Sequence, residues 1–520
     1  MVSVAAGKAA YFPAYSAPRR ERNHCLHYFL SAMLFNSFEF LVYFPVVVLV
    51  CFWLPFRYRW AWLLGASCLF YMAFIPVYIL ILFFTIVIDY YAGLYIERAR
   101  GSARKRLLTV SIVANVGVLA VFKYYNFLND NLGFLFTGFA LENPVPYLNI
   151  ILPIGLSFHT FQAMSYTIGV YRGTQPAERH LGYYSLYVMY FPQLVAGPIE
   201  RPQNVLHQFH QKHDLDYFRT LDGLKRMTWG MFKKVVVADN LAVMVNNVYN
   251  QPADYEGVSL LIATVFFSFQ IYCDFSGYSD IAIGASHIMG IRLMENFNRP
   301  YYAKSIGEFW RRWHISLSTW FRDYLYIPLG GNRVSVPRQY FNLFFIFMVS
   351  GIWHGANWTF IIWGALHGFY QIFGRLTKPY RDAFNAQTGL TRLPGLLKLL
   401  QVVSTFLLVA FAWIFFRANS VTDAFYIVEH LFTGIGNWRE AFGSQSRHVL
   451  FLDAPPRIFF IGLLSVCLME AVHLVQRHGS VTEALARKPV WVRWPVYYGA
   501  VALILLLGNF GSSQFIYFQF

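Results

Sequence analysis

The residues with the clearest capacity for chemistry are two histidines in the second half of the chain. His354 lies in GIWHGANW, residues 351–358, between two apolar runs, and His314 lies in EFWRRWHISL. A neutral imidazole, with an ordinary pKa of about 6.5, can take a proton from a hydroxyl or a thiol. Flanking glycines and indoles predict a narrow slot around His354, with that side chain as general base. The alternative is a buried histidine bonded to a neighbour.

The histidines and cysteines do not form a metal-binding pattern. A metal site on one helix needs two close ligands, such as an i, i+4 pair, and His314, His354 and His367 lack such a spacing. The five cysteines are scattered, without a CxxC pair, mostly in apolar runs where cysteine acts as a small hydrophobic residue. We expect neither a metal site nor a disulfide.

A basic and aromatic segment, residues 304–338, precedes the stretch around His354. Its large apolar side chains recur every three or four residues, a spacing that predicts an amphipathic helix lying at, or dipping into, the membrane interface. These side chains are Trp310, Trp313, Leu317, Trp320, Phe321 and Tyr324. The arginines Arg311, Arg312, Arg322 and Arg333 could hold phosphate groups, because guanidinium contacts phosphate with two hydrogen bonds. Binding of lipid headgroups is an equal alternative.

Three further polar groups interrupt apolar sequence. His159, Gln162 and Ser165 share one helix face and suit hydrogen bonds between membrane helices. The stretch FPQLVAGPIERP, residues 191–202, should break a helix at its prolines and glycine. Asp274 and Asp280 are either helix caps or members of a polar site, since carboxylates within membrane segments are costly.

The elements that must position these residues are membrane helices. Of the 520 residues, 57% are hydrophobic and only 13% are charged, which excludes an ordinary soluble domain. A spanning helix needs roughly 20 mostly apolar residues. The expected spans, some of them partial, are 37–54, 60–75, 76–95, 107–122, 150–170, 183–197, 257–273, 340–363, 398–416, 457–475 and 491–509, with weaker segments at 226–248 and 276–292. We predict an all-α, multi-spanning membrane protein with one membrane domain, residues 33–520.

Positive charge orients the chain. Arg98, Arg100, Arg104, Lys105 and Arg106 crowd one short connection, which should face the cytoplasm. The arginines at 19, 20 and 22 conflict with that topology, because they precede the first span on the opposite side. The conflict disappears if translation starts at Met33, so we interpret residues 1–32 as a dispensable extension or a mis-assigned start. The net charge of +16 lies in connections between spans, which argues against nucleic acid as a partner.

The ordered motifs resemble those of the membrane-bound O-acyltransferase (MBOAT) family, and in particular its bacterial branch that acetylates alginate. The motifs are LPIGLSFHTFQAMSYTIGVYRG, FPQLVAGPIERP, YCDFSGYSDIAIG, FNRPYYAKSI, EFWRRWHISLSTWFRDYLYIPLGG, SGIWHGANW and the ending FIYFQF. The resemblance runs from about Met33 to Phe520. It implies a ring of helices with a central funnel and tunnel, His354 as the catalytic histidine and His314 as the second functional one.

The same resemblance implies a reaction and its participants. Acetyl-CoA would donate from the cytoplasm of a bacterium, across its inner membrane, and the acetyl group would reach an exopolysaccharide or cell-wall polymer. A periplasmic SGNH-type acetyltransferase or a polysaccharide-biosynthesis complex would be the partner. By analogy with a related D-alanine transfer system, Tyr517 would carry the acyl group on its phenol.

Acyl transfer also assigns roles to the remaining candidates. Asn357 or a nearby indole N–H could stabilise the oxyanion. We expect Trp313 and Trp353, with the arginines at 311, 312, 322 and 333, to line the donor site. Two other functions compete with the acyltransferase: a transporter or flippase of an acylated or lipid substrate, and a scaffold that only recruits periplasmic enzymes. The chain lacks the repeated halves that are typical of transporters.

Overall fold

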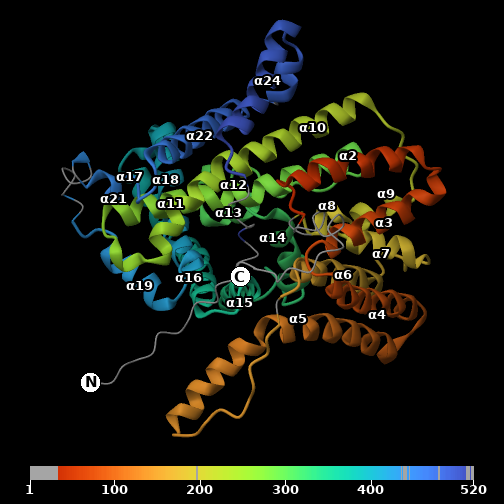
Figure 1. The fold of residues 1–520 in the computed structure, drawn as a ribbon. Helices are drawn as coiled ribbons and strands as arrows, with labels where there is room; N and C mark the ends of the chain where they lie inside the picture. Colours follow the sequence, from red (N-terminus) through yellow and green to blue (C-terminus); the bar gives the residue numbers. More distant parts are fainter. Residues whose placement is uncertain are drawn as a thin grey trace, which may run out of the picture.

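The computed structural model describes residues 33–150, 152–194, 197–434, 436, 442–443, 445–477, 479, 481–510 and 516. All regular secondary structure in these ranges is helical, as predicted (Figure 1). The α-helices are α2 (Phe38–Trp53), α3 (Phe56–Met72), α4 (Ile79–Arg98), α5 (Gly101–Gly138), α6 (Leu156–Arg172), α7 (Leu181–Met189), α8 (Phe191–Leu194), α9 (Pro202–Phe209), α10 (Tyr217–Met231), α11 (Asp239–Asn250), α12 (Val258–Ile288), α13 (Ile306–Arg312), α14 (Ile315–Phe321), α15 (Val336–His354), α16 (Trp358–Leu376), α17 (Lys378–Gln387), α18 (Pro394–Arg417), α19 (Val421–His430), α21 (Ser446–Val449), α22 (Pro456–Val475), α23 (Val481–Ala486) and α24 (Val490–Leu507). Two π-helical stretches, η2 (Phe232–Ala238) and η5 (Arg322–Tyr326), extend neighbouring helices.

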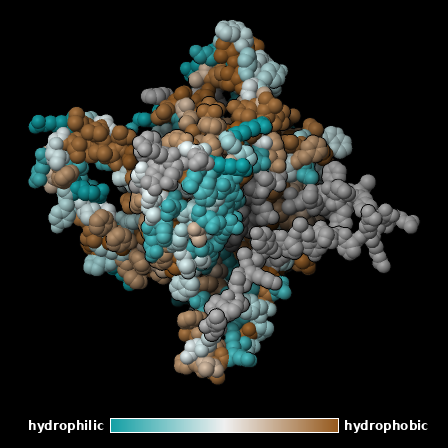
Figure 2. Space-filling view, turned by 60° about the vertical axis from the view of Figure 1, so that its left-hand side comes forward, coloured by the Kyte–Doolittle hydropathy of each residue, from teal (hydrophilic) through white to brown (hydrophobic). Residues whose placement is uncertain are grey.

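Six helices within the described ranges are long and apolar enough to cross a membrane. They are Pro76–Arg98, Gly101–Gly138, Val258–Ile288, Pro394–Arg417, Pro456–Val475 and Val490–Leu507. Their outward faces are hydrophobic, and Figure 2 shows hydrophobic residues over much of the visible surface beside a hydrophilic patch. Helix α24 projects away from the other helices (Figure 1). Because large apolar surfaces on soluble proteins are rare, this exposure fits a lipid-facing exterior.

Several predicted spans have different boundaries in the structure. The separate segments 257–273 and 276–292 form one continuous helix, α12, so Asp274 and Asp280 lie inside a helix and do not cap one. The segment 340–363 is divided between α15 and α16. The predicted break near Pro192 is present, because α7 ends at Met189 and only the short α8 follows it.

The prediction of a single amphipathic helix within residues 304–338 is also wrong. His314 has φ 43°, a left-handed conformation that ends α13 and separates it from α14. Most aromatic side chains of the predicted stripe are buried in the protein interior, with Trp313 only 1% exposed and Tyr324 half-buried, so the stripe is not a surface that faces the membrane interface. The segment is a pair of short helices that holds His314 at the bend.

Contacts between connections bring several helix ends close together. The α4–α5 connection carries the predicted cluster of arginines, and Arg179 forms an ion pair with Glu97 beside it. The Arg59 Nη1 donates to the carbonyl of His213, and Gln208 Nε2 donates to the carbonyl of Arg292, just beyond α12. We call this side of the protein the arginine-rich side.

Candidate active site

His354 is the last residue of α15, at the turn of a helical hairpin. The chain turns at residues 355–357 and returns as α16. Asn357 stabilises this turn, because its Oδ1 accepts from the Thr359 backbone N–H at 3.0 Å and its Nδ2 donates to the Asn419 carbonyl at 3.3 Å. The polar residues inside this apolar stretch therefore form the end of one helix and the N-cap of the next.

Glycines allow the two helices of the hairpin to lie in close contact. A Cβ atom on Gly351 would lie 2.3 Å from the Phe360 carbonyl oxygen, and one on Gly364 would lie 2.4 Å from the Phe347 carbonyl oxygen. Neither position can hold a larger side chain without moving backbone. This is the close approach of small residues that membrane helices use for packing.

Aromatic rings enclose the His354 imidazole, which is 4% exposed. The ring centroids of Trp353, Trp363 and Phe416 lie 4.8, 5.0 and 5.3 Å from that of His354, each in an edge-on arrangement. The indole N–H groups of Trp353 and Trp363 are buried and meet no hydrogen-bond acceptor among the described residues. An apolar enclosure with unused N–H donors suits stabilisation of a developing oxyanion.

Lys123, on α5, fixes the end of the hairpin helix from the side. Its Nζ donates to the carbonyl oxygens of Trp353 at 2.7 Å and of His354 at 2.8 Å. Carbonyl groups in the last turn of a helix have no partner within the helix, and the helix dipole places partial negative charge there. A lysine is therefore well matched to this position, and it couples α5 to His354.

His314 presents one ring nitrogen to the interior. Its Nδ1 lies 3.2 Å from Asn296 Oδ1, which also accepts from the Ser316 hydroxyl at 2.9 Å. Asn296 Nδ2 donates to Ser279, so its Oδ1 is the acceptor and the neutral His314 carries its proton on Nδ1. The Nε2 atom is buried and has no partner among the described residues, which leaves its lone pair available to a substrate.

The fold brings the two predicted histidines into one region. The Phe158 ring lies 6.2 Å from the His314 ring and 5.8 Å from Trp353, the residue before His354. Lys123 donates to the His354 carbonyl, and the Trp363 ring lies between the His354 and His367 rings, 5.0 Å from the first and 4.9 Å from the second. A third imidazole, His367, accepts from the Trp310 indole at 3.3 Å on the far side of Trp363.

The four predicted phosphate-binding arginines do not share one site. Arg322 is exposed and pairs with Asp323, and Arg311 and Arg333 are also exposed on other parts of the segment. Arg312 alone joins the cationic cavity described next. Trp313 packs in the core, with its ring 5.1 Å from Trp413, and does not line that cavity.

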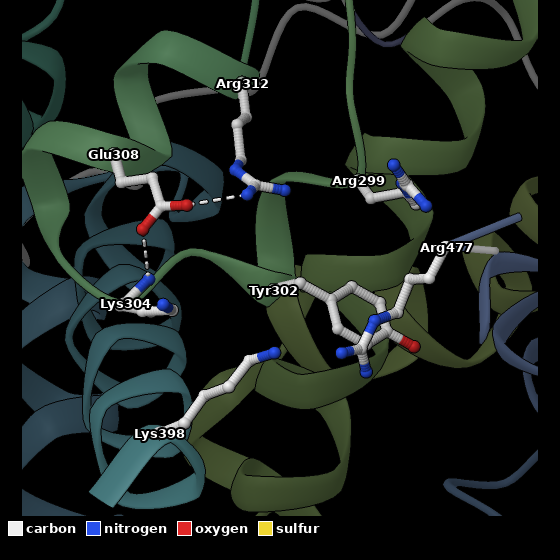
Figure 3. Close-up of a pocket in the computed structure, with 7 residues that line it drawn as sticks. All are labelled: Arg299, Tyr302, Lys304, Glu308, Arg312, Lys398 and Arg477. Carbon is white, nitrogen blue, oxygen red and sulfur yellow. Dashed lines mark hydrogen bonds and ion pairs between the residues drawn. The ribbon is translucent and has the colours of Figure 1, made fainter. Parts of the chain in front are cut away.

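A cationic cavity of about 280 Å³ lies beside α13, α18 and the end of α22 (Figure 3). It is lined by five cationic residues, one carboxylate and one phenol: Arg299, Lys304, Arg312, Lys398, Arg477, Glu308 and Tyr302. Glu308 accepts from Arg312 at 2.6 Å and from the Lys304 backbone N–H at 2.9 Å. Burial alone would raise the pKa of Glu308. These hydrogen bonds and the neighbouring positive charges outweigh burial, so the pKa of Glu308 lies below its ordinary value. The cavity therefore keeps excess positive charge.

Sequence reasoning missed most of this cavity. Lys398 lies at the start of the predicted span 398–416, and Arg477 lies just after the predicted span 457–475. Two consecutive predicted spans put these ends on the same side, which was the available signal that the two cations could share a site. Arg299 directly precedes Pro300 and has a left-handed backbone, with φ 45°. Tyr302 donates to Glu470 at 2.6 Å and joins the turn to α22.

The remaining predictions for the site have mixed outcomes. His159 makes the expected bond between helices, with its Nε2 2.5 Å from Thr85 Oγ1. No cluster of three or more His, Cys, Asp or Glu side chains that could hold a metal occurs among the described residues. Tyr517 and residues 1–32 lie outside the described residues. The expected tunnel stays a prediction, because His354 and His314 line neither the cationic cavity nor the apolar groove beside α22.

Comparisons with known proteins identify the class. The sequence model of the MBOAT, membrane-bound O-acyltransferase, family matches residues 174–404, which include both histidines. The probable alginate O-acetylase of Pseudomonas aeruginosa is 43% identical over 411 residues, covering 78% of this chain and 76% of that protein. The corresponding protein of Pseudomonas putida is 41% identical over 502 residues, covering 94% of this chain and 100% of that protein. The peptidoglycan O-acetyltransferase of Helicobacter pylori is 33% identical over 509 residues, covering 88% of this chain and 91% of that protein.

Fold, site and relatives together define a multi-pass membrane enzyme that transfers acyl groups to hydroxyls. The chain belongs to the membrane-bound O-acyltransferase family.

Proposed function

We propose that the chain moves an acetyl group from cytoplasmic acetyl-CoA across the bacterial inner membrane for O-acetylation of an extracellular polymer. The polymer is an alginate-like exopolysaccharide or a cell-wall polysaccharide, in line with the names of the relatives. A periplasmic SGNH-type acetyltransferase or a polysaccharide-biosynthesis complex completes the transfer. The observation that carries the proposal is the pair of buried histidines, His314 and His354, which the fold assembles from separate helices.

The chemical step transfers the acetyl carbon from sulfur to oxygen. The His354 imidazole takes the proton of the attacking hydroxyl, whose oxygen bonds to the thioester carbonyl carbon. Collapse of the tetrahedral intermediate breaks the carbon–sulfur bond, and the proton passes to the departing CoA thiolate. His314 Nε2, the other buried imidazole nitrogen of the site, orients the hydroxyl or relays this proton.

The oxyanion of the intermediate needs N–H donors. The indole N–H groups of Trp353 and Trp363 fit this role better than Asn357, because both are buried beside His354 without an acceptor among the described residues. Both ends of the Asn357 amide already bond to the hairpin and to Asn419. Asn357 then supports catalysis by holding the turn after His354.

The cationic cavity receives the phosphate groups of the donor. The excess of arginine and lysine over a single carboxylate suits a polyphosphate. The proposal requires this cavity to face the cytoplasm, where acetyl-CoA is available, and the positive-inside rule favours that side for a group of arginines and lysines. Of the arginines at 311, 312, 322 and 333, only Arg312 lines this cavity, so it is the one that would contact the phosphate groups of the donor.

Tyr517 carries the acetyl group between donor and polymer. Its phenol attacks the thioester to form an aryl ester and release CoA, and the next hydroxyl displaces the phenol. The neighbouring residue Ile516 is buried in the same core as Trp363 and Phe416, which surround His354. This placement of Ile516 supports the assignment.

Reconstituted protein tests the proposal directly. Proteoliposomes with the arginine-rich side outward receive acetyl-CoA labelled in the acetyl group, and labelled protein, labelled acceptor and free CoA are measured. We expect continuous CoA release only with both the protein and an acceptor, and without an acceptor no more than one CoA released for each protein that becomes labelled. CoA release no faster than that of vesicles with an unrelated membrane protein would contradict the proposal.

A further inference from the structure

A buried ion cluster beside the site has one more carboxylate than cation. Lys234 Nζ lies 2.8 Å from Asp239 Oδ1 and 2.7 Å from Asp274 Oδ1, and the three side chains are 1 to 4% exposed. Charges buried in this way are costly unless their remaining hydrogen-bonding positions are also satisfied. The second oxygen of Asp274 therefore requires a donor.

The donor is the C-terminal end of the chain itself. The backbone N–H of Ile516 donates to Asp274 Oδ2 at 2.7 Å, and the Ile516 side chain is only 2% exposed. This contact links two residues that are 242 positions apart in the sequence. A charge-assisted hydrogen bond in an apolar interior is among the stronger single contacts available.

The same cluster holds the chain where it leaves α24. The Asn509 backbone N–H donates to the Val235 carbonyl at 2.9 Å, and its side chain donates to the Asp239 carbonyl at 3.2 Å. Asn240 Nδ2 donates to the Leu507 carbonyl at 3.0 Å. Val235 belongs to the π-helical stretch η2, and such stretches often occur at functional sites because they free backbone groups for other partners.

The cluster also lies next to the candidate active site. Asp274 is followed on α12 by Phe275, whose ring lies 4.6 Å from the His314 ring. A residue covalently joined to Ile516 has its Cα about 3.8 Å from that of Ile516. The contact between Asp274 and Ile516 thus joins the residue that precedes Tyr517 in the sequence to the residue that precedes a ring in contact with His314.

We propose that Lys234, Asp239 and Asp274 form a dock for the chain's own C-terminal end, with Asp274 as a positioning residue for Tyr517. The role of Tyr517 rests on the proposed function; the dock itself does not. In this account, the Ile516 N–H replaces the water that the Asp274 carboxylate would bind in solvent. The same hydrogen bond holds the segment that carries Tyr517 for acyl transfer.

Hydrogen–deuterium exchange on the full chain in lipid nanodiscs tests the dock without reference to activity. In Asp274→Asn, we expect the amide of residue 516 to exchange roughly tenfold faster than in the wild type, because the amide side chain is a weaker acceptor than the carboxylate. Asp280→Asn is the matched control: it removes a carboxylate on the same helix that pairs with Lys233 and Arg226. Unchanged exchange at 516 in Asp274→Asn, or equal acceleration in both variants, would overturn the dock.

A second pair of variants leaves the ion cluster intact. Ile516→Pro removes the N–H donor, whereas Ile516→Val retains it. We expect Ile516→Pro to lower kcat roughly tenfold at an unchanged KM for acetyl-CoA, and Ile516→Val to stay near the wild type. Equal kcat values for the two variants would refute the positioning role. If the wild type itself transfers no acetyl group, the proposed function fails, while the exchange experiment still decides the dock.

Discussion

The Nζ atom of Lys123 lies 2.8 Å from the carbonyl oxygen of His354. This contact joins the long helix α5 to the end of the hairpin helix α15, and the same ammonium group also binds the Trp353 carbonyl. The catalytic candidate is therefore held from outside its own hairpin. The residues that position His354 come from parts of the chain that no local motif connects.

Loss of the Lys123 ammonium should impair catalysis more than folding. Lys123→Met removes two charge-assisted hydrogen bonds while keeping a similar apolar stem, and we expect kcat for CoA release to fall roughly tenfold. Lys105→Met, an exposed change on the same helix, should leave kcat unchanged. Equal kcat values for these two variants would show that Lys123 does not position His354.

The cationic cavity should control donor affinity. Lys398→Glu and Arg477→Glu reverse charge at the cavity, so we expect each to raise KM for acetyl-CoA by roughly tenfold, with a smaller effect at high salt. Arg333→Glu changes an arginine outside the cavity and should leave KM unchanged. A larger increase in KM for Arg333→Glu would favour the original sequence-based set of arginines over the cavity.

The hairpin should tolerate no side chain at its closest point. Gly351→Ala places a methyl group 2.3 Å from the Phe360 carbonyl oxygen, and we expect overpacking to cost about 1–3 kcal/mol. Gly374→Ala lies on α16 with nothing within 4 Å of the added Cβ, so it should be neutral or slightly stabilising. Thermal unfolding in detergent, followed by size-exclusion chromatography, compares the two. A transition temperature for Gly351→Ala at or above that of Gly374→Ala would contradict the close packing.

The carrier role of Tyr517 predicts a labelled intermediate. With acetyl-CoA labelled in the acetyl group and no acceptor, the wild type should accumulate label that is released by mild base, as expected for an aryl ester. Tyr517→Phe removes only the phenol oxygen and should abolish this label, whereas Tyr498→Phe, on the exposed helix α24, should not. Normal transfer to the polymer by Tyr517→Phe would eliminate the carrier.

Sequence analysis selected histidines that the fold brings into one region, but it did not predict the backbone shape around them. His314 and His354 were identifiable because imidazoles are unusual in apolar sequence, and the glycines beside His354 indicated close helix packing. The bend at His314 was not identifiable, because a left-handed backbone at histidine follows from tertiary contacts such as the one with Asn296. A regular aromatic spacing therefore predicted one helix where two are present.

The cationic cavity and the ion cluster show a second limit of sequence analysis. Lys398 and Arg477 belong to different helices, and only the fold places them around Arg312. Asp274 could be read as a cap, because aspartate before an apolar run often has that role. Its ion pair with Lys234 and its bond to Ile516 depend on contacts across the whole chain.

The most direct test of the account is acetyl transfer by His354→Gln. Glutamine keeps a polar side chain of similar size but cannot act as a general base, so we expect transfer from acetyl-CoA to fall by roughly a hundredfold or more, at an unchanged KM and thermal stability. His207→Gln, an exposed histidine on α9, serves as the control and should retain full activity. Transfer by His354→Gln within about twofold of that control would contradict the central role of His354.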